Sequence, residues 1–233
     1  DRKYDNLINI LGADHTGYIK RIKSAVSALS DNKTLLDCKV CQLVKLYKNG
    51  QPFKMSKRAG EFISAQDLLD EVEKDPIRFM MLNRSNDVEL DFDFDKVKEK
   101  NKDNPVFYVQ YAYARINSIL RSLKIKFTNK VELNDKDFQL NEIEQKILRK
   151  VFEWPKIIES ACNKFDLHKI PVYLYDLATL FHSYWSKGNE DEKYKFIRDE
   201  KIKRNEIFAI MNLTAIVLQN GMGILGVSLP DKM

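Results

Sequence analysis

The chain has 233 residues, of which 44% are hydrophobic and 31% charged, as in a globular protein with its own core. We expect neither a signal peptide nor a membrane span, because no apolar run approaches the roughly 20 residues that cross a bilayer. The net charge of +5 is unevenly distributed. Residues 1–95 hold 15 basic and 16 acidic side chains, whereas the remainder holds 24 and 18. The second part is therefore the one expected to bind a polyanion.

The first part has the pattern of an α/β unit. The apolar run 7–11 ends at Gly12 and predicts a strand, and residues 16–29 have helical spacing. Residues 38–47 alternate like a strand, and Lys48-Asn49-Gly50 turns the chain. Asp75-Pro76 predicts a helix over 77–83, and the extended stretch 89–95 closes the unit.

The second part is expected to be helical, because no glycine occurs between Gly60 and Gly188. Helices are predicted over 104–123, 141–165, 171–185 and 193–219. Trp154-Pro155 should bend or break the second helix, and 207–218 is apolar nearly all round and should be buried. The predicted fold is an α/β fragment over 1–95 followed by an all-α helical bundle over 96–233.

The strongest chemical signal is the loop that begins Lys54-Met55-Ser56-Lys57-Arg58. Two lysines on either side of a hydroxyl residue suit a triphosphate whose leaving pyrophosphate gains charge in the transition state. A solvated basic loop is the alternative for an arbitrary pair of lysines. The full string is similar to the second signature of class I aminoacyl-tRNA synthetases, whose loop closes over ATP during adenylation.

Other segments narrow the resemblance to arginyl-tRNA synthetases over essentially the whole chain. They follow in the family's order: Gly12-Ala13-Asp14-His15-Thr16-Gly17-Tyr18, Asp75-Pro76-Ile77-Arg78-Phe79, Leu90-Asp91-Phe92-Asp93, and the Asn104-Pro105 helix through Tyr108, Gln110-Tyr111-Ala112 and Ala114-Arg115. The earlier class I signature, His-x-Gly-His, is absent. We therefore expect a C-terminal fragment that is inactive alone in pyrophosphate exchange.

The resemblance implies an arginine–tRNA ligase that uses ATP, with Mg²⁺, to form arginyl-adenylate and then charges tRNA. It implies catalytic roles for Lys54, Ser56 and Lys57. It also implies an ATP site that adds the following residues: Gly12, Asp14, His15, Met55 and Arg58. Asp14 and His15 follow the first predicted strand, at the end where open α/β sheets bind ligands; the alternative is that Asp14 caps the next helix.

One face of the 104–123 helix could bind RNA. At about 100° per residue, Tyr108, Tyr111 and Arg115 fall within about 60° of one another and away from the core stripe 109, 113, 116, 120 and 123. Two rings and a guanidinium can stack on an unpaired base, but they can equally pack on a neighbouring helix. The resemblance implies tRNA anticodon contacts for this face and for Phe181, Trp185 and the C-terminal Met233. Ordinary helix packing is the alternative for Phe181 and Trp185.

Cys38 and Cys41 do not predict a metal site, because residues three apart in a strand point to opposite faces. With only Cys162 besides, the thiols fit a reducing cytoplasm, and a monomer without membrane contact is expected. Two rival functions stay open at this point. One is a non-catalytic RNA-binding module derived from a synthetase, and the other is a ligase for another amino acid.

Overall fold

The computed structural model describes residues 4–53, 63–128 and 139–233. It divides into two compact units. The α/β unit comprises Asp1–Phe62 and Arg84–Phe94, and the helical unit comprises Ile63–Asn83 and Asp95–Met233. The larger segment of the helical unit begins at Asp95, one residue before the start expected at 96. The helical unit also includes residues 63–83, which the sequence had placed with the α/β part.

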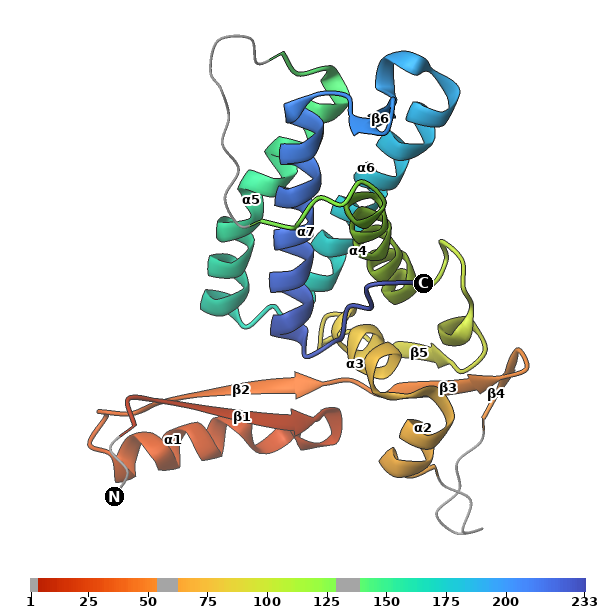
Figure 1. The fold of residues 1–233 in the computed structure, drawn as a ribbon. Coiled ribbons are helices and arrows are strands. Elements are labelled where there is room, and N and C mark those ends of the chain that lie inside the picture. Colours follow the sequence, from red (N-terminus) through yellow and green to blue (C-terminus); the bar gives the residue numbers. More distant parts are fainter. Residues whose placement is uncertain (1–3, 54–62, 129–138) are drawn as a thin grey trace. The chain divides into compact units, whose positions relative to one another are not determined.

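The α/β unit contains two small sheets (Figure 1). In the first, β1 (Asn6–Gly12) pairs in parallel with β2 (Leu35–Cys41), and the crossover between them carries a 3₁₀ turn (Ala13–Tyr18) and α1 (Ile19–Leu29). In the second, β3 (Val44–Lys48) pairs antiparallel with β4 (Gln51–Pro52) and parallel with β5 (Leu90–Asp93). The turn between β3 and β4 is tight because Asn49 (φ 52°) and Gly50 (φ 69°) adopt the left-handed conformation of a type I′ hairpin.

The single strand predicted over 38–47 is in fact two strands in different sheets. The chain leaves β2 at Gln42, whose N–H donates to the carbonyl of Asn86 (2.8 Å). The Asn86 side chain in turn donates to the Val40 carbonyl (2.7 Å). These hydrogen bonds to a distant segment redirect the backbone, and local alternation cannot reveal them.

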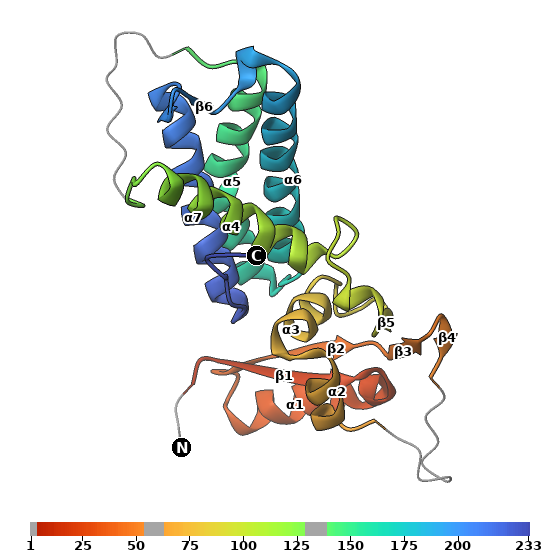
Figure 2. The same cartoon turned by 45° about the vertical axis from the view of Figure 1, so that its right-hand side comes forward.

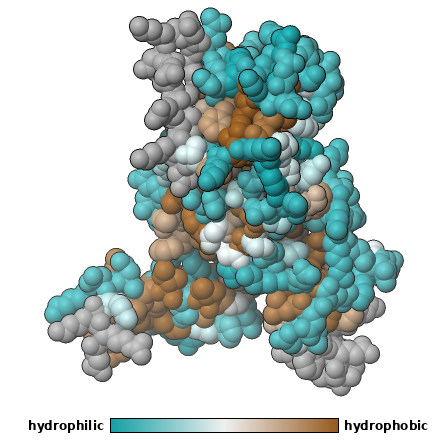
Figure 3. Space-filling model, in the orientation of Figure 1, coloured by the Kyte–Doolittle hydropathy of each residue, from teal (hydrophilic) through white to brown (hydrophobic). Residues whose placement is uncertain are grey.

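The strands β1 and β2 present apolar side chains to the solvent in this chain. Ile8 is 49% exposed, Ile10 71% and Leu35 69%. Figure 3 shows apolar side chains over these two strands. Parallel sheets are normally covered on both faces, so this is an open face of the α/β unit.

The helical unit is built around four long helices. Helices α5 (Glu142–Lys164), α6 (Lys169–Glu190) and α7 (Asn205–Leu225) pack side by side, and α4 (Pro105–Ser122) crosses them (Figures 1 and 2). The smaller elements of this unit are α2 (Ala65–Val72), α3 (Lys74–Leu82), the 3₁₀ turns Lys96–Lys98 and Glu192–Tyr194, and the hairpin strands β6 (Ile197–Arg198) and β7 (Lys201–Ile202).

The core of the helical unit follows the predicted patterns. On α4, Val109, Ile116 and Leu120 are at most 2% exposed, which confirms the core stripe. Helix α7 is the buried helix that was predicted, with Ile207 and Leu218 fully buried. On length and composition α7 could cross a bilayer, contrary to the expectation that no run would. However, 61% of its apolar window is buried, as in the core helix of a bundle.

The helix break expected at Pro155 and the helix start expected at 193 are both wrong. Helix α5 continues through Pro155, because tertiary packing supports it there: Trp154 stacks on Tyr173 of α6 (5.2 Å between centroids), and the Tyr173 hydroxyl donates to the Lys150 carbonyl. The helix predicted from 193 begins only at Asn205. Before it lies the β6–β7 hairpin, which is preceded by Phe196, buried against Tyr184 (4.5 Å between centroids).

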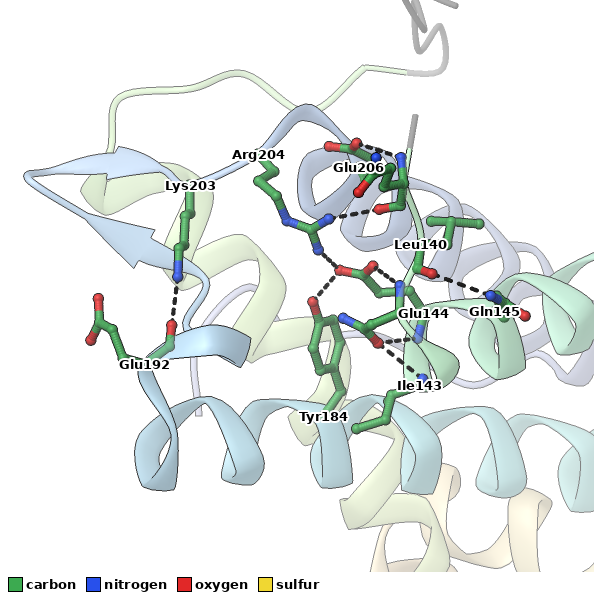
Figure 4. Close-up of polar contacts among 11 residues, drawn as sticks. Leu140, Ile143, Glu144, Gln145, Tyr184, Glu192, Lys203, Arg204 and Glu206 are labelled. Atoms are coloured by element: carbon green, nitrogen blue, oxygen red, sulfur yellow. Dashed lines mark hydrogen bonds and ion pairs between the residues drawn. The ribbon is translucent and has the colours of Figure 1, made fainter. Parts of the chain in front are cut away.

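The buried carboxylate of Glu144 links α5, α6 and the residue that precedes α7 (Figure 4). Glu144, fully buried near the start of α5, accepts hydrogen bonds from the Tyr184 hydroxyl of α6 and from Arg204, the residue that precedes α7. It also accepts from the backbone N–H of Asn141 (2.8 Å), which completes a capping box at the start of α5. Burial, and then hydrogen bonding to Glu144, raise the pKa of Tyr184.

Candidate nucleic-acid interface

The nucleotide-site residues predicted in the α/β unit lie at the carboxyl end of β1. Gly12 closes the strand, and a Cβ at this position would lie 2.7 Å from Asp14 Oδ1. His15 Nε2 lies 3.7 Å from Asp14 Oδ2, and both side chains are exposed. Asp14 does not cap α1, whose N-cap is Tyr18 with no side-chain hydrogen bond. The structure therefore places Gly12, Asp14 and His15 together, and the capping alternative is wrong.

The basic loop is the other predicted half of the nucleotide site. Lys54, Met55, Ser56, Lys57 and Arg58 all lie outside the described residues. The predicted relation between the two halves of the nucleotide site therefore stays a prediction.

The predicted RNA-binding face of α4 packs on α6, which is the alternative considered for it, and its side chains still keep part of their surface in solvent. Arg115 Nη2 donates to the Tyr111 hydroxyl (2.7 Å), and the guanidinium lies over the Tyr111 ring, 4.4 Å from its centroid. The same guanidinium lies 5.5 Å from the ring centroid of Trp185 on α6. The structure thus brings together Tyr111, Arg115 and Trp185, with the cation between two aromatic rings.

His182 is the member of this cluster that the sequence reasoning missed. Its ring lies between the two tyrosines, 4.3 Å from the Tyr108 centroid and 5.4 Å from that of Tyr111. Its Nε2 lies 3.0 Å from the Tyr108 carbonyl oxygen, which can only accept, so Nε2 carries the proton. Its Nδ1 is then the acceptor for Arg115 Nη1 at 2.9 Å. The only signal in the sequence was its position three residues before Trp185, on the same face of a helix.

The imidazole of His182 is held neutral by its surroundings. Burial lowers its pKa to about 4; the hydrogen bond to the Tyr108 carbonyl opposes the shift, and the Arg115 cation adds to it. A proton on Nδ1 would face the guanidinium and remove the hydrogen bond from Arg115. The neutral ring therefore fixes the orientation of Arg115 between α4 and α6.

The four aromatic and basic side chains Tyr108, Tyr111, Arg115 and Trp185 are half-buried, and each keeps part of its surface in solvent. Two of the five N–H donors of Arg115 are used, which leaves three for a ligand. Burial raises the pKa of Tyr108, so its hydroxyl stays protonated and can donate. Partly exposed aromatic rings beside a guanidinium are the groups on which proteins stack unpaired bases. We call these four residues the α4–α6 surface.

Phe181 does not belong to this surface. It is fully buried and packs against Phe196 (6.0 Å between centroids). Helix packing, the alternative considered for it, is what the structure supports, because a side chain with no exposed area cannot touch RNA in this conformation. Phe196 also meets Trp185 edge-on (5.3 Å between centroids), so a buried ring supports the half-buried tryptophan.

Met233 is 53% exposed and ends a tail held along a different side of α4. Gln110 donates to the Ser228 carbonyl (3.0 Å), and Asn117 donates to Asp231 Oδ1 (3.2 Å). These α4 residues lie roughly 140° around the helix from the α4–α6 surface at 100° per residue. The structure therefore does not bring the tail to the aromatic face.

Residues 109–233 match the family described as the DALR anticodon binding domain. This chain belongs to the DALR anticodon binding domain family. The matched range of the DALR domain contains the predicted contact residues Tyr111, Arg115, Phe181, Trp185 and Met233 and begins one residue after Tyr108.

Relatives of the whole chain are arginine–tRNA ligases. The arginine–tRNA ligase of Pelagibacter ubique is 55% identical over 233 residues, which are 100% of this chain and 40% of the relative. A solved structure from Campylobacter jejuni, assigned to the arginyl-tRNA synthetases, is 31% identical with a TM-score of 0.85 and covers 100% of this chain and 49% of that one. Thermus thermophilus arginyl-tRNA synthetase shares the fold (TM-score 0.70, 18% identity, 99% and 42% covered). The chain thus spans about two fifths of the length of its curated relatives, and the resemblance to arginyl-tRNA synthetases is confirmed.

Proposed function

We propose that the protein to which this chain belongs is an arginine–tRNA ligase, and that the DALR domain binds the anticodon loop of its tRNA through the α4–α6 surface. The observation that carries the proposal is the Arg115 guanidinium between the rings of Tyr111 and Trp185, within a DALR domain. The identity of the curated relatives supports arginine as the amino acid.

Recognition on this surface would combine stacking with directed hydrogen bonds. An unpaired base can stack on the exposed part of Tyr108 or Trp185, and the remaining N–H groups of Arg115 can donate to its edge or to a phosphate. The neutral His182 ring holds the guanidinium in place before the RNA arrives. Because these groups are ordered by contacts within the domain, little side-chain freedom would be lost on binding.

The catalytic part of the proposal rests on the α/β unit. Gly12, Asp14 and His15, at the end of β1, would line the site for ATP, which enters as its Mg²⁺ complex. Lys54, Ser56 and Lys57, with Met55 and Arg58 beside them, would bind the phosphates. The two ammonium groups would neutralise the charge that grows on the leaving pyrophosphate as the arginine carboxylate attacks the α-phosphorus.

The metal in this proposal belongs to the substrate. Among residues 4–53, 63–128 and 139–233, no group of three or more His, Cys, Asp or Glu side chains could hold a metal ion. Phosphate oxygens commonly supply much of the Mg²⁺ coordination in nucleotide sites, and protein adds one or two carboxylates. Asp14 is the exposed carboxylate at the strand end that could take such a role.

Assays on the full-length protein test this function. Arginine should be the amino acid that supports ATP–pyrophosphate exchange and the charging of tRNA. Exchange with a different amino acid would identify another ligase. Tight tRNA binding with no exchange for any amino acid would favour the non-catalytic RNA-binding module.

We propose a cytoplasmic enzyme that acts as a monomer, since charging of tRNA takes place where ribosomes work and the three described cysteines are unpaired. Light scattering on the purified full-length protein would check the monomer, and cell fractionation would check the location.

A further inference from the structure

A second basic site lies at the C-terminal end of α4. A pocket of about 370 Å³ opens there. Its charged lining consists of Arg121, Lys124 and Lys126 against the single carboxylate of Asp231, and Leu120 and Phe127 supply apolar walls. The pocket is larger than a water site and at the lower end of the range for small ligands, roughly 300 to 1,000 Å³.

The carbonyl groups at the C-terminal end of α4 do not neutralise the positive charge of the pocket. The N–H of Ile125 donates to the Leu120 carbonyl (2.8 Å), and the N–H of Lys124 donates to the Arg121 carbonyl (3.0 Å). The last carbonyls of α4 are thus occupied by a Schellman-type cap, which reduces their pull on the lysines. Lys124 takes the left-handed position of this cap (φ 54°), where glycine is the usual residue. The chain therefore carries a cation at a position whose backbone favours glycine.

The C-terminal tail closes one side of the pocket and leaves the lysines available. Asp231 is fixed by α4: its carbonyl oxygen accepts from Arg121 Nη2 (2.8 Å) and its Oδ1 accepts from Asn117 (3.2 Å). Within the part of the chain that the structure describes, neither Lys124 nor Lys126 forms an ion pair, and both are exposed. Two ammonium groups and a guanidinium with spare donors therefore converge on one opening.

We propose that this pocket binds a backbone phosphate of the tRNA whose anticodon loop lies on the α4–α6 surface. The inference rests on the proposed function, because one tRNA would have to contact both the α4–α6 surface and this pocket, which lies on the other side of α4. A phosphodiester offers the three cations two oxygens that share one negative charge, and the adjoining ribose can contact Phe127. A free phosphate shares this chemistry, so the experiment must separate the two sources.

The test compares the parent chain, Lys124→Gly and the double variant Lys124→Gly/Lys126→Gln. Their tRNA dissociation constants are measured between about 50 and 200 mM salt. Loss of one phosphate contact should reduce the slope of log K against log salt by about 0.7 to 0.9 and weaken binding at low salt several-fold. Lys156→Gln, which removes an exposed lysine of α5 outside the pocket, is the matched control and should leave the slope unchanged.

The thermal unfolding midpoint of each variant shows whether weaker tRNA binding comes from a lost phosphate contact or from a destabilised fold. Lys124→Gly relieves a left-handed backbone, so its thermal unfolding midpoint should be no lower than that of the parent. Weaker tRNA binding by a variant that is at least as stable supports the inference; unchanged affinity and slope in the double variant overturn it. Saturable binding of inorganic phosphate that the double variant loses, with equal tRNA affinity, would assign the pocket to a free anion and also overturn it. A parent chain that binds no tRNA would overturn the proposed function along with the inference.

Discussion

Arg115 donates a hydrogen bond to Nδ1 of His182 across 2.9 Å, so α4 and α6 of the DALR domain meet through a guanidinium and a neutral imidazole. The same imidazole donates to the Tyr108 carbonyl, which fixes its tautomer. The residue expected to read RNA is therefore oriented by one that does not face the solvent.

Unfolding of the helical unit should depend on pH through His182. Its pKa is lowered from 6.5 to about 4 in the folded state, so the unfolded chain binds the proton more readily. The free energy of unfolding should hold above pH 6.5 and fall as the pH drops toward 4, by at most about 3 kcal/mol. Denaturant titrations at several pH values would measure this loss.

The control for the pH effect uses two histidine variants. His182→Asn should flatten the dependence between pH 6.5 and 4, whatever its effect on overall stability. His15→Asn removes an exposed histidine and should leave the dependence as in the parent chain. An equal slope in the His182 variant and the parent would remove the imidazole from this role.

Removing one hydrogen-bond partner of the buried Glu144 carboxylate should lower the free energy of unfolding. Arg204→Met leaves a fully buried carboxylate without its cation and should lower the free energy of unfolding by about 3 to 5 kcal/mol. Tyr184→Phe removes one hydrogen bond to the same carboxylate and should cost about 1 to 3 kcal/mol. By comparison, Lys150→Met breaks a more exposed ion pair with Asp176 and should cost less than about 1 kcal/mol through that pair. A small loss in Arg204→Met would mean that Glu144 does not need its partner.

Two glycines of the helical unit should respond oppositely to alanine. A Cβ on Gly188 would lie 2.8 Å from the backbone oxygen of Tyr194, so Gly188→Ala must push apart α6 and the segment that carries Phe196. A Cβ on Gly223 meets nothing within 4 Å, so Gly223→Ala in α7 should stabilise by about 0.5 to 1 kcal/mol. Thermal unfolding of both variants checks this, and a Gly188→Ala variant as stable as the parent would contradict the close approach.

Lys57 is expected to act in the chemical step. In the full-length enzyme, Lys57→Ala should lower kcat by at least about two orders of magnitude, because one charge contact to the leaving pyrophosphate is lost. Lys33→Ala removes an exposed lysine after α1 and serves as the control, with kcat unchanged. Pyrophosphate exchange rates that agree between Lys57→Ala and the parent would exclude this role.

Local patterns predicted the helix that carries the site. The 3.6-residue period of α4 identified both its buried stripe and the face of Tyr108, Tyr111 and Arg115, because both depend only on helix geometry. The turn at Asn49-Gly50 was likewise predictable, since its left-handed conformation is a property of those two residues.

Contacts between distant elements were not predictable from such patterns. His182 belongs to the site because α4 crosses α6, which brings its ring to Arg115. Phe181 does not belong to it, because its side chain points into the core. A 3₁₀ turn and the β6–β7 hairpin replace the first part of the helix predicted over 193–219, because Phe196 packs against Tyr184 and Trp185 of α6. In each case a partner far along the chain outweighed the local preference.

The most direct test of the account is the affinity of the chain for arginine tRNA, measured at fixed salt for the parent, Arg115→Ala and Arg149→Ala. Arg149 is an exposed arginine of α5 outside the α4–α6 surface, so its variant matches the loss of charge. We predict that Arg115→Ala weakens binding at least about tenfold, through loss of charge-assisted hydrogen bonds, and that Arg149→Ala changes it less than about twofold. Equal affinities for the folded Arg115→Ala variant and the parent would contradict the claim that this surface binds the tRNA.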